Sequence, residues 1–354
     1  MTDNLPDSVN TVLGSKPLSE LGRILTHEHL AVDVTKFYTP PPKHLKYYPS
    51  GCPSLQTIGY IRQYPYSNIY NMELFGDDAA KAVYKDVELF KEAGGGTIVE
   101  NSNHGLKRDV PFLKNVSQSS GVNIIAGTGF YVASSQNAST LNMTEENMYN
   151  LMRKELEENC VEASDVKAGF IGEVGSTWPI EDFEKRAIRA TGEVQAQLHC
   201  SVSFHPGRDP SAPMEIMRIY QEAGGDASKA IMSHIDRTLI TKDQIMEFAD
   251  ATKCYIQFDL FGIETSLYQL NPTIDMISDA GRIKRISQLK EEGKLNRVLM
   301  SQDIHTKHRL THFGGHGYTH IINNIAPVMI ERDFTIEEIE TLTIENPKKW
   351  LSRK

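Results

Sequence analysis

The strongest constraint on the fold is a regular alternation of short apolar runs with amphipathic helical patterns. Runs of strand length occur eight times, at residues 23–30, 97–100, 122–126, 168–173, 201–205, 230–234, 254–259 and 297–303. Helical patterns fill the gaps: Val83, Val87 and Phe90, for example, share one face before Gly94 ends the pattern. Eight strand-then-helix units predict the α/β class and a (β/α)8 TIM barrel, with an open doubly wound sheet as the alternative.

Length and composition are compatible with a single barrel domain. The 354 residues are 40% hydrophobic and 23% charged, which excludes disordered and fibrous proteins. We expect one domain over 1–354, with an N-terminal hairpin or flap at 1–22. The segment 36–77, after the first strand, is a long loop of the kind that forms lids or substrate-binding walls. Thr335 and Glu338 predict a capping box for the last helix.

Charge and cysteine content restrict the partners and the compartment. With 37 Lys and Arg against 46 Asp and Glu, the net charge of -9 argues against nucleic acid or an anionic membrane as partner. The four cysteines are scattered without a C-x-x-C pair, so we expect reduced thiols. The first ten residues are polar and do not resemble a signal peptide. The expected location is the cytosol.

Polar residues occupy the ends of several predicted strands. Alternate residues of an extended strand share a face, so His27 and His29 should project together, with Thr26 and Glu28 on the other side. Each polar residue alone has an ordinary explanation, such as a helix cap or a core histidine. Strand carboxyl ends converge at one mouth of a barrel, however, and would bring six of these side chains together. They are His27, His29, Glu173, His205, His234 and Asp303.

Four imidazoles and two carboxylates predict a metal site. A set without thiolate suits Zn, Mn, Fe or Co, and six ligands exceed what one tetrahedral ion uses. We therefore expect two divalent metal ions, with Zn2+ favoured and Mn, Co or Fe as alternatives. One ion would be held by His27, His29 and Asp303, the other by His205 and His234, with Glu173 as the bridge.

Taken together, these motifs resemble the phosphotriesterase branch of the amidohydrolase superfamily, and within it the phosphotriesterase-related proteins. The resemblance covers nearly the whole chain. The motifs that carry it are Asn10-Thr11-Val12, residues 25–30, Gly172-Glu173, Ser301-Gln302-Asp303 and Asn346-Pro347. The founding phosphotriesterases use a carboxylated lysine as the bridge, whereas this chain has Glu173. The strand-seven region, 258–261, also lacks the histidine that lines their pocket. Both differences argue against organophosphate hydrolysis.

The resemblance implies a metal-dependent amidohydrolase for a small N-acyl anionic amine. Animal phosphotriesterase-related proteins resemble amidases that cleave N-acyl taurines such as N-acetyltaurine to acetate and taurine. Asp303 would be the catalytic residue that transfers a proton to the leaving amine. Hydrolysis of a lactone, a carboxylic ester or, weakly, a phosphotriester is the alternative. An alternative of another class is a metal-stabilised binding protein without catalysis.

The loop after strand eight is the candidate site for binding a charged group of the substrate. Lys307 and Arg309 follow Asp303 closely and could bind an anionic group, although a solvated loop would have the same composition. His104 and Tyr131 could line the same mouth, or could be ordinary polar loop residues. The expected partner is a small anionic substrate; a homodimer is allowed, and no nucleic acid or membrane partner is expected.

Overall fold

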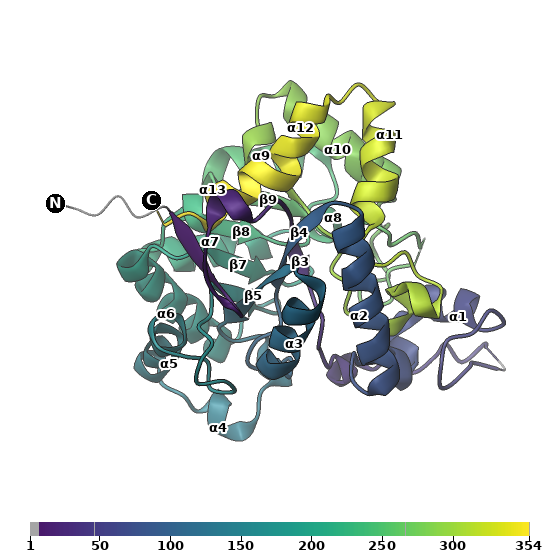
Figure 1. Cartoon of the computed structure of the whole chain (residues 1–354), viewed down its shortest axis with the longest axis horizontal. Coiled ribbons are helices and arrows are strands. Elements are labelled where there is room, and N and C mark those ends of the chain that lie inside the picture. The colour runs from purple at the N-terminus through teal and green to yellow at the C-terminus, as the bar shows by residue number, and fades with distance from the viewer. Residues whose placement is uncertain (1–6, 46, 266, 354) are drawn as a thin grey trace.

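Eight parallel strands form a nearly closed barrel, shown from one side in Figure 1. The structure is a computed structural model that describes residues 7–353 apart from 46 and 266. The strands pair in chain order and are β3 (Arg23–Glu28), β4 (Gly95–Glu100), β5 (Asn123–Thr128), β6 (Phe170–Gly175), β7 (Val202–His205), β8 (Ala230–Met232), β9 (Tyr255–Phe258) and β10 (Val298–Met300). At the closure the backbone N of Asp303 donates to the His27 carbonyl, 3.0 Å away. The predicted TIM barrel is confirmed and the doubly wound sheet is excluded.

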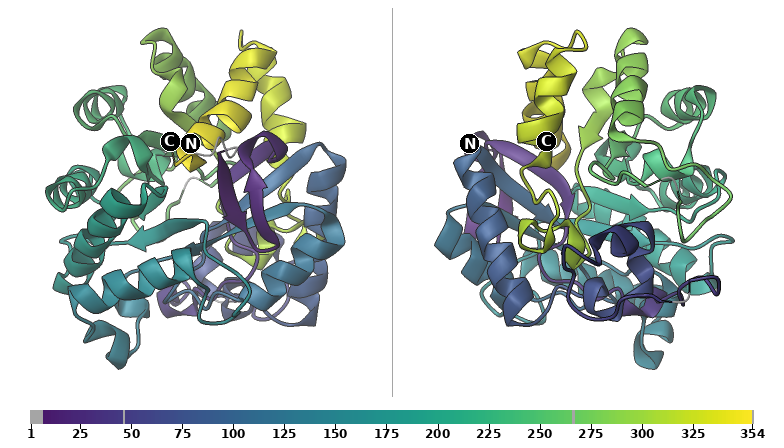
Figure 2. Two further views of the ribbon diagram at one scale, coloured as in Figure 1. Left: turned by 60° about the vertical axis from the view of Figure 1, so that its left-hand side comes forward. Right: turned by 90° about the vertical axis from the view of Figure 1, so that its right-hand side faces the viewer.

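Helices cover the outside of the barrel, as the two views of Figure 2 show. The longer ones are α2 (Asp77–Glu92), α3 (Val110–Ser120), α5 (Glu145–Glu157), α6 (Asp182–Leu198), α7 (Ala212–Glu222), α9 (Lys242–Thr252) and α10 (Asp279–Glu291). The shorter ones are α1 (Ile58–Gln63), α4 (Ala138–Leu141), α8 (Ile235–Thr238), α11 (Ala326–Ile330), α12 (Ile336–Glu340) and α13 (Asn346–Leu351). The predicted capping box of Thr335 and Glu338 begins α12. Of the helices that the described residues form, none combines the length and apolar character needed to cross a bilayer.

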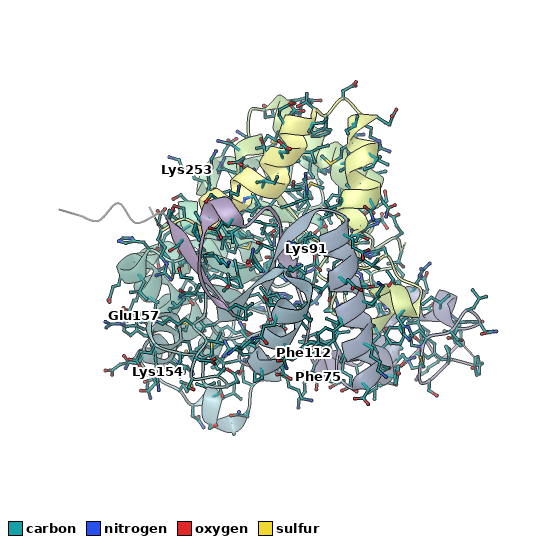
Figure 3. The ribbon with its side chains drawn as sticks, in the orientation of Figure 1. Phe75, Lys91, Phe112, Lys154, Glu157 and Lys253 are labelled. Atoms are coloured by element: carbon teal, nitrogen blue, oxygen red, sulfur yellow. The ribbon has the colours of Figure 1, made fainter. Side chains whose placement is uncertain are left out.

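Each long helix turns one apolar stripe inward. In α2 the buried stripe contains Val83, Val87 and Phe90, while Lys91 is exposed. Figure 3 labels Lys91 together with Lys154 and Glu157 of α5, all of which are exposed on the outer surface. This amphipathic pattern is the one that the spacing of apolar residues predicts.

The amino end of the barrel is filled by apolar side chains. Ile24, Phe170, Ile231 and Leu299, from four strands, form one cluster with Trp350 of α13. Trp350 is completely buried, and its Nε1 donates to the carbonyl of Val202 at 3.2 Å. The interior therefore has an apolar floor, and polar side chains gather above it, toward the carboxyl ends of the strands.

The N-terminal segment lies at this amino end. Strands β1 (Ser8–Thr11) and β2 (Gly14–Pro17) form an antiparallel hairpin. Residues 1–6 of the predicted hairpin or flap at 1–22 lie outside the described residues. The Val12 backbone N donates to the carbonyl of Ile124, at the start of β5, and Asn10 Nδ2 donates to the carbonyl of Ala168. The hairpin thus packs where the strands begin and does not form a flap over the mouth.

Candidate metal centre

The structure brings the six predicted ligands together at the carboxyl ends of the strands. His27 and His29 lie at the end of β3, Glu173 is in β6 and His205 ends β7, while His234 and Asp303 follow β8 and β10. The six form two groups, His27 with His29 and Asp303, and Glu173 with His205 and His234. Ligand atoms within each group lie within 4.8 Å of one another. All six residues are buried, with at most 7% of the residue surface exposed.

Glu173 lies between the two groups. Its Oε1 is 3.5 Å from Nε2 of His29, and its Oε2 is 3.6 Å from Nε2 of His27. The same Oε2 is 2.7 Å from Nδ1 of His205 and 3.5 Å from Nε2 of His234. One carboxylate therefore faces both sets of imidazoles, which is the position that a bridging ligand needs.

The donor set fits divalent metal ions. Nε2 of His27 is buried and has no hydrogen-bond partner in the described part of the chain, an arrangement that is costly unless something else binds the nitrogen. Imidazole nitrogens and carboxylate oxygens without thiolate suit Zn, Mn, Co or Fe. Two divalent ions with Glu173 between them would use all six side chains.

The outer nitrogens of the imidazoles are held by neighbouring side chains. Nδ1 of His29 is 2.9 Å from Oγ of Ser102, and Nδ1 of His27 is 3.2 Å from Oγ of Ser233. Such contacts fix the ring orientation and aim Nε2 at the centre.

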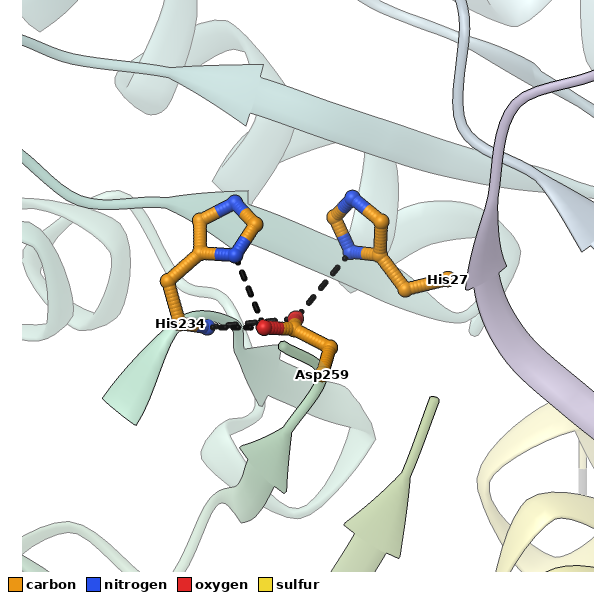
Figure 4. Close-up of side chains that lie close together, drawn as sticks. All are labelled: His27, His234 and Asp259. Atoms are coloured by element: carbon orange, nitrogen blue, oxygen red, sulfur yellow. Dashed lines mark hydrogen bonds and ion pairs between the residues drawn. The ribbon is translucent and has the colours of Figure 1, made fainter. Parts of the chain in front are cut away.

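Asp259 is a site residue that the sequence reasoning did not identify. Its carboxylate lies between the rings of His27 and His234, as Figure 4 shows, at 2.8 Å from Nδ1 of His234 and 3.4 Å from Nδ1 of His27. These three residues could themselves hold an ion. Because Asp259 meets the Nδ1 atoms while the Nε2 atoms face Glu173, we assign it an orienting role. Its place directly after β9, equivalent to those of the other site residues, is the signal that could have revealed it.

The carboxylates make the centre favourable for positive charge. Burial alone would lower the pKa of His27, but Glu173, Asp259 and Asp303 raise it to about 10. Burial would raise the pKa of Glu173, but His205 and His27 hold it well below its ordinary value. The carboxylates are therefore ionised and stabilise a cation among them, whether a proton or a metal ion.

Two of the six residues have unusual backbone conformations. His234 and Asp303 have φ angles of 55° and 51°, in the left-handed region. Such a conformation costs a non-glycine residue on the order of 1–3 kcal/mol and persists only where neighbouring contacts impose it. The His234 backbone N donates to Oδ1 of Asp259 at 3.0 Å, which is one such contact.

Strict alternation along β3 is not maintained. Thr26, predicted on the face opposite His27, donates from Oγ1 to Oε1 of Gln257 on β9, 2.6 Å away, across the barrel interior. The pairing of β3 with β4 shifts register between Leu25 and Glu28. This irregularity corrects the predicted direction of Thr26.

A cavity of about 330 Å³ opens directly above the donor cluster. One wall of the cavity is formed by the segment 36–77 and includes Phe37 and Tyr66. Another is formed by the loop after β9 and includes Leu260, Tyr268 and Gln269. The backbone N of Tyr66 donates to Oε1 of Gln269 at 3.1 Å, which ties the two walls together. The long segment after the first strand is thus a wall of the pocket.

Two of the four expected substrate-binding residues line this cavity. Tyr131 Oη is 3.2 Å from Nε2 of His205. Arg309 is also in the wall, but it donates to the backbone carbonyls of Asp303 and Phe261.

The other two are directed elsewhere, which corrects the expectation for both. Lys307 is buried, with Nζ 3.6 Å from Oδ2 of Asp78 and 3.7 Å from the ring centre of Tyr70. Nε2 of His104 is 3.1 Å from Oε2 of the buried Glu155. Each side chain is held by a structural partner that is distant in the sequence.

Three further arginines line the cavity and were not anticipated. One of them, Arg62, is exposed. Arg208 follows His205 by three residues, and Arg237 follows His234 by three residues. This equal spacing after two predicted ligands is the sequence signal that could have identified Arg208 and Arg237.

The chain matches known proteins over nearly its whole length. The model of the phosphotriesterase family matches residues 7–351. The phosphotriesterase-related protein of Drosophila persimilis is 51% identical over 346 residues, covering 98% of this chain and 99% of its own. A resiniferatoxin-binding protein from Rhodobacter sphaeroides superposes with a TM-score of 0.92 at 25% identity, over 98% of this chain and 95% of its own. A variant of a phosphotriesterase-like lactonase from Deinococcus radiodurans shares the fold, with a TM-score of 0.75 at 21% identity, over 97% of this chain and 100% of its own.

Metal content tests the bridging position of Glu173. Protein reconstituted with Zn, Mn or Co should bind about two ions per chain. Glu173→Gln should reduce the content to about one or less, because the amide lacks the charge that both ions would share. Elemental analysis after gel filtration measures this, with the exposed Glu193→Gln on α6 as the matched control.

Reassembly should not require bicarbonate, because Glu173 carries its own carboxylate. Wild-type protein that binds less than about one ion per chain would contradict the two-ion site. Recovery of metal binding only with added bicarbonate would show that another residue is the bridge.

Proposed function

Because this chain belongs to the phosphotriesterase family, we propose that it is a binuclear metal-dependent hydrolase that cleaves the amide of a small N-acyl anionic amine. N-acetyltaurine, hydrolysed to acetate and taurine, is the favoured substrate and Zn2+ the favoured metal. The observation that carries the proposal is a concentration of guanidinium groups beside the donor cluster, in a chain whose net charge is -9.

Four arginines lie in the wall of the cavity: Arg62 is exposed, whereas Arg208, Arg237 and Arg309 are partly or fully buried. In the described part of the chain, their guanidinium groups are bound by backbone carbonyls, a tyrosine hydroxyl and other uncharged groups and form no ion pair with a carboxylate. Burying a guanidinium costs free energy unless an opposite charge compensates it. A sulfonate or carboxylate on the substrate would supply that charge.

Asp303 is placed to move the proton that amide cleavage requires. The metal ions, when bound, would polarise the scissile carbonyl and lower the pKa of the attacking water. Asp303 Oδ1 lies 3.2 Å from Nε2 of His29 and 3.1 Å from Nδ1 of His305, at the boundary between centre and cavity. An amine leaves an amide only after protonation, so a carboxylate that takes a proton from the water can return it to the leaving nitrogen.

His305 and Tyr66 support this carboxylate from the cavity side. Nε2 of His305 is 2.9 Å from Oη of Tyr66, and the two rings stack with centres 5.9 Å apart. The imidazole therefore stays against Asp303, and the long segment 36–77 contributes to the position of the proton-transferring group.

Hydrolysis of a lactone or a carboxylic ester is the second candidate. The cavity wall also contains apolar side chains, including Val34, Phe37, Leu106 and Ile263, which suit an apolar substrate. The lactonase from Deinococcus radiodurans has the same fold. The absence of a histidine in 258–261 and the glutamate bridge still argue against phosphotriesters.

A binding protein without catalysis is the third candidate, since the relative from Rhodobacter sphaeroides is named for binding resiniferatoxin. The convergence of all six donor side chains argues against it.

A substrate panel tests the proposal. Metal-loaded protein is assayed for acetate and taurine release from N-acetyltaurine, for opening of a γ-lactone and for paraoxon hydrolysis. We expect the highest kcat/KM with N-acetyltaurine. A higher value for the lactone would establish the second candidate instead, and no turnover of any substrate would contradict a hydrolase.

Asp303→Asn should lower kcat by about a hundredfold or more, because the amide cannot carry the proton. Much of the metal should remain bound through the histidines and Glu173, so metal content is measured on the same sample. The exposed Asp275→Asn is the control. Near-normal turnover by Asp303→Asn would exclude the proton-transfer role.

A further inference from the structure

Besides the exposed Arg62, three arginines line the cavity, and they differ in the partners of their guanidinium groups. Arg309 uses Nη1 to donate to the carbonyl of Asp303 at 2.7 Å, and Nη2 to donate to the carbonyl of Phe261 at 2.8 Å. The second bond joins the loop after β10 to the loop after β9. Arg309 therefore stabilises the backbone around the centre: both of its terminal nitrogens are engaged, and Nε, which has no partner among the described residues, is buried.

Arg237 is directed against the donor cluster itself. Its Nη2 donates to the carbonyl of Pro206 at 3.1 Å and lies 3.2 Å from Nε2 of His205, while Nη1 donates to Oγ1 of Thr238 at 3.2 Å. Its burial against His205 makes it part of the support of a candidate metal ligand.

Arg208 is different, because only Nε is engaged. It donates to Oη of Tyr268 at 2.7 Å, and the guanidinium carbon lies 5.7 Å from the centre of the same ring. The two terminal nitrogens make no hydrogen bond or ion pair with any described residue. Glu264, a wall carboxylate outside the donor cluster, accepts instead from the backbone N of Asp279 at 2.6 Å.

We propose that the two terminal nitrogens of Arg208 bind the acid group of the substrate, and that Tyr268 is the residue that positions them. This inference rests on the proposed function, an amide of an anionic amine. A guanidinium fork matches two oxygens of a sulfonate or carboxylate, and bidentate pairing is strongest where the arginine is held in one orientation. The hydrogen bond to Tyr268 provides that orientation.

The position of Arg208 also restricts the substrate class. It lines the same cavity as His205, His234 and Asp303, so the acid would bind beside the centre where the carbonyl would be cleaved. A short linker between amide nitrogen and acid, such as the two carbons of taurine, meets this requirement. Arg208, rather than Lys307, would therefore bind the anionic group of the substrate.

The test compares an anionic with a neutral substrate. For Arg208→Gln, the ratio of kcat/KM for N-acetyltaurine to that for N-acetylethanolamine should fall roughly tenfold or more, as loss of charge-assisted hydrogen bonds requires. Arg208→Lys keeps the positive charge but loses the two parallel N–H donors, so this ratio should fall less than in Arg208→Gln. Tyr268→Phe should raise KM for the anionic substrate and leave kcat nearly unchanged, which a general loss of structure would not do.

Two arginine variants serve as controls. Arg218→Gln removes an exposed arginine on α7, the helix that follows Arg208, and should leave the ratio unchanged. Arg237→Gln alters the support of His205 and should affect both substrates alike. An unchanged ratio in Arg208→Gln would overturn the proposal.

A second measurement separates this inference from the proposed function. Ethanesulfonate should inhibit the hydrolysis of a γ-lactone or another neutral substrate by wild-type protein, with a Ki raised roughly tenfold or more in Arg208→Gln. This readout needs no amide cleavage. Absent turnover of N-acetyltaurine would therefore refute the proposed function alone, whereas equal Ki values would refute the role of Arg208.

Discussion

The structure depends on the burial of three carboxylates, Glu173, Asp259 and Asp303, among imidazoles at the mouth of a sealed barrel. The negative charge of an ionised carboxylate in such a place must be compensated by nearby positive charge or hydrogen-bond donors. The surrounding imidazoles supply this compensation. Asp259 faces the Nδ1 atoms of His27 and His234. Glu173 faces Nε2 of His27, and Asp303 faces Nε2 of His29. The left-handed backbone at His234 and Asp303 is tolerated because these contacts fix both residues.

The barrel accounts for the position of this cluster. Apolar side chains from the strands and Trp350 of α13 fill the amino end, so a polar cluster can form only toward the carboxyl ends. Strand pairing in chain order then brings His27 of β3 beside Asp303, which follows β10, although they are far apart in the sequence. The variable loops beyond the strands add the cavity wall, including Arg208 and Tyr268, without disturbing the floor.

Much of the barrel and the convergence of the six donor residues could be predicted, because the period of apolar residues and the polar strand ends are local features. Other features depended on long-range packing. Lys307 begins a short 3-10 turn, Lys307–Arg309, and its ammonium lies 3.6 Å from Oδ2 of Asp78. His104 is held by Glu155, a residue 51 positions away. The spacing of three residues after His205 is a local signal for Arg208, but the orientation of its guanidinium depends on Tyr268, which is 60 positions away.

Anomalous diffraction from crystals of the Mn- or Zn-loaded protein, collected at the absorption edge of the metal, tests the central claim most directly. We expect two anomalous peaks about 3.5–4 Å apart, with the carboxylate of Glu173 between them. One peak should lie against His27, His29 and Asp303, and the other against His205 and His234. A single peak, or a second ion bound away from Glu173, would contradict a binuclear centre bridged by this residue.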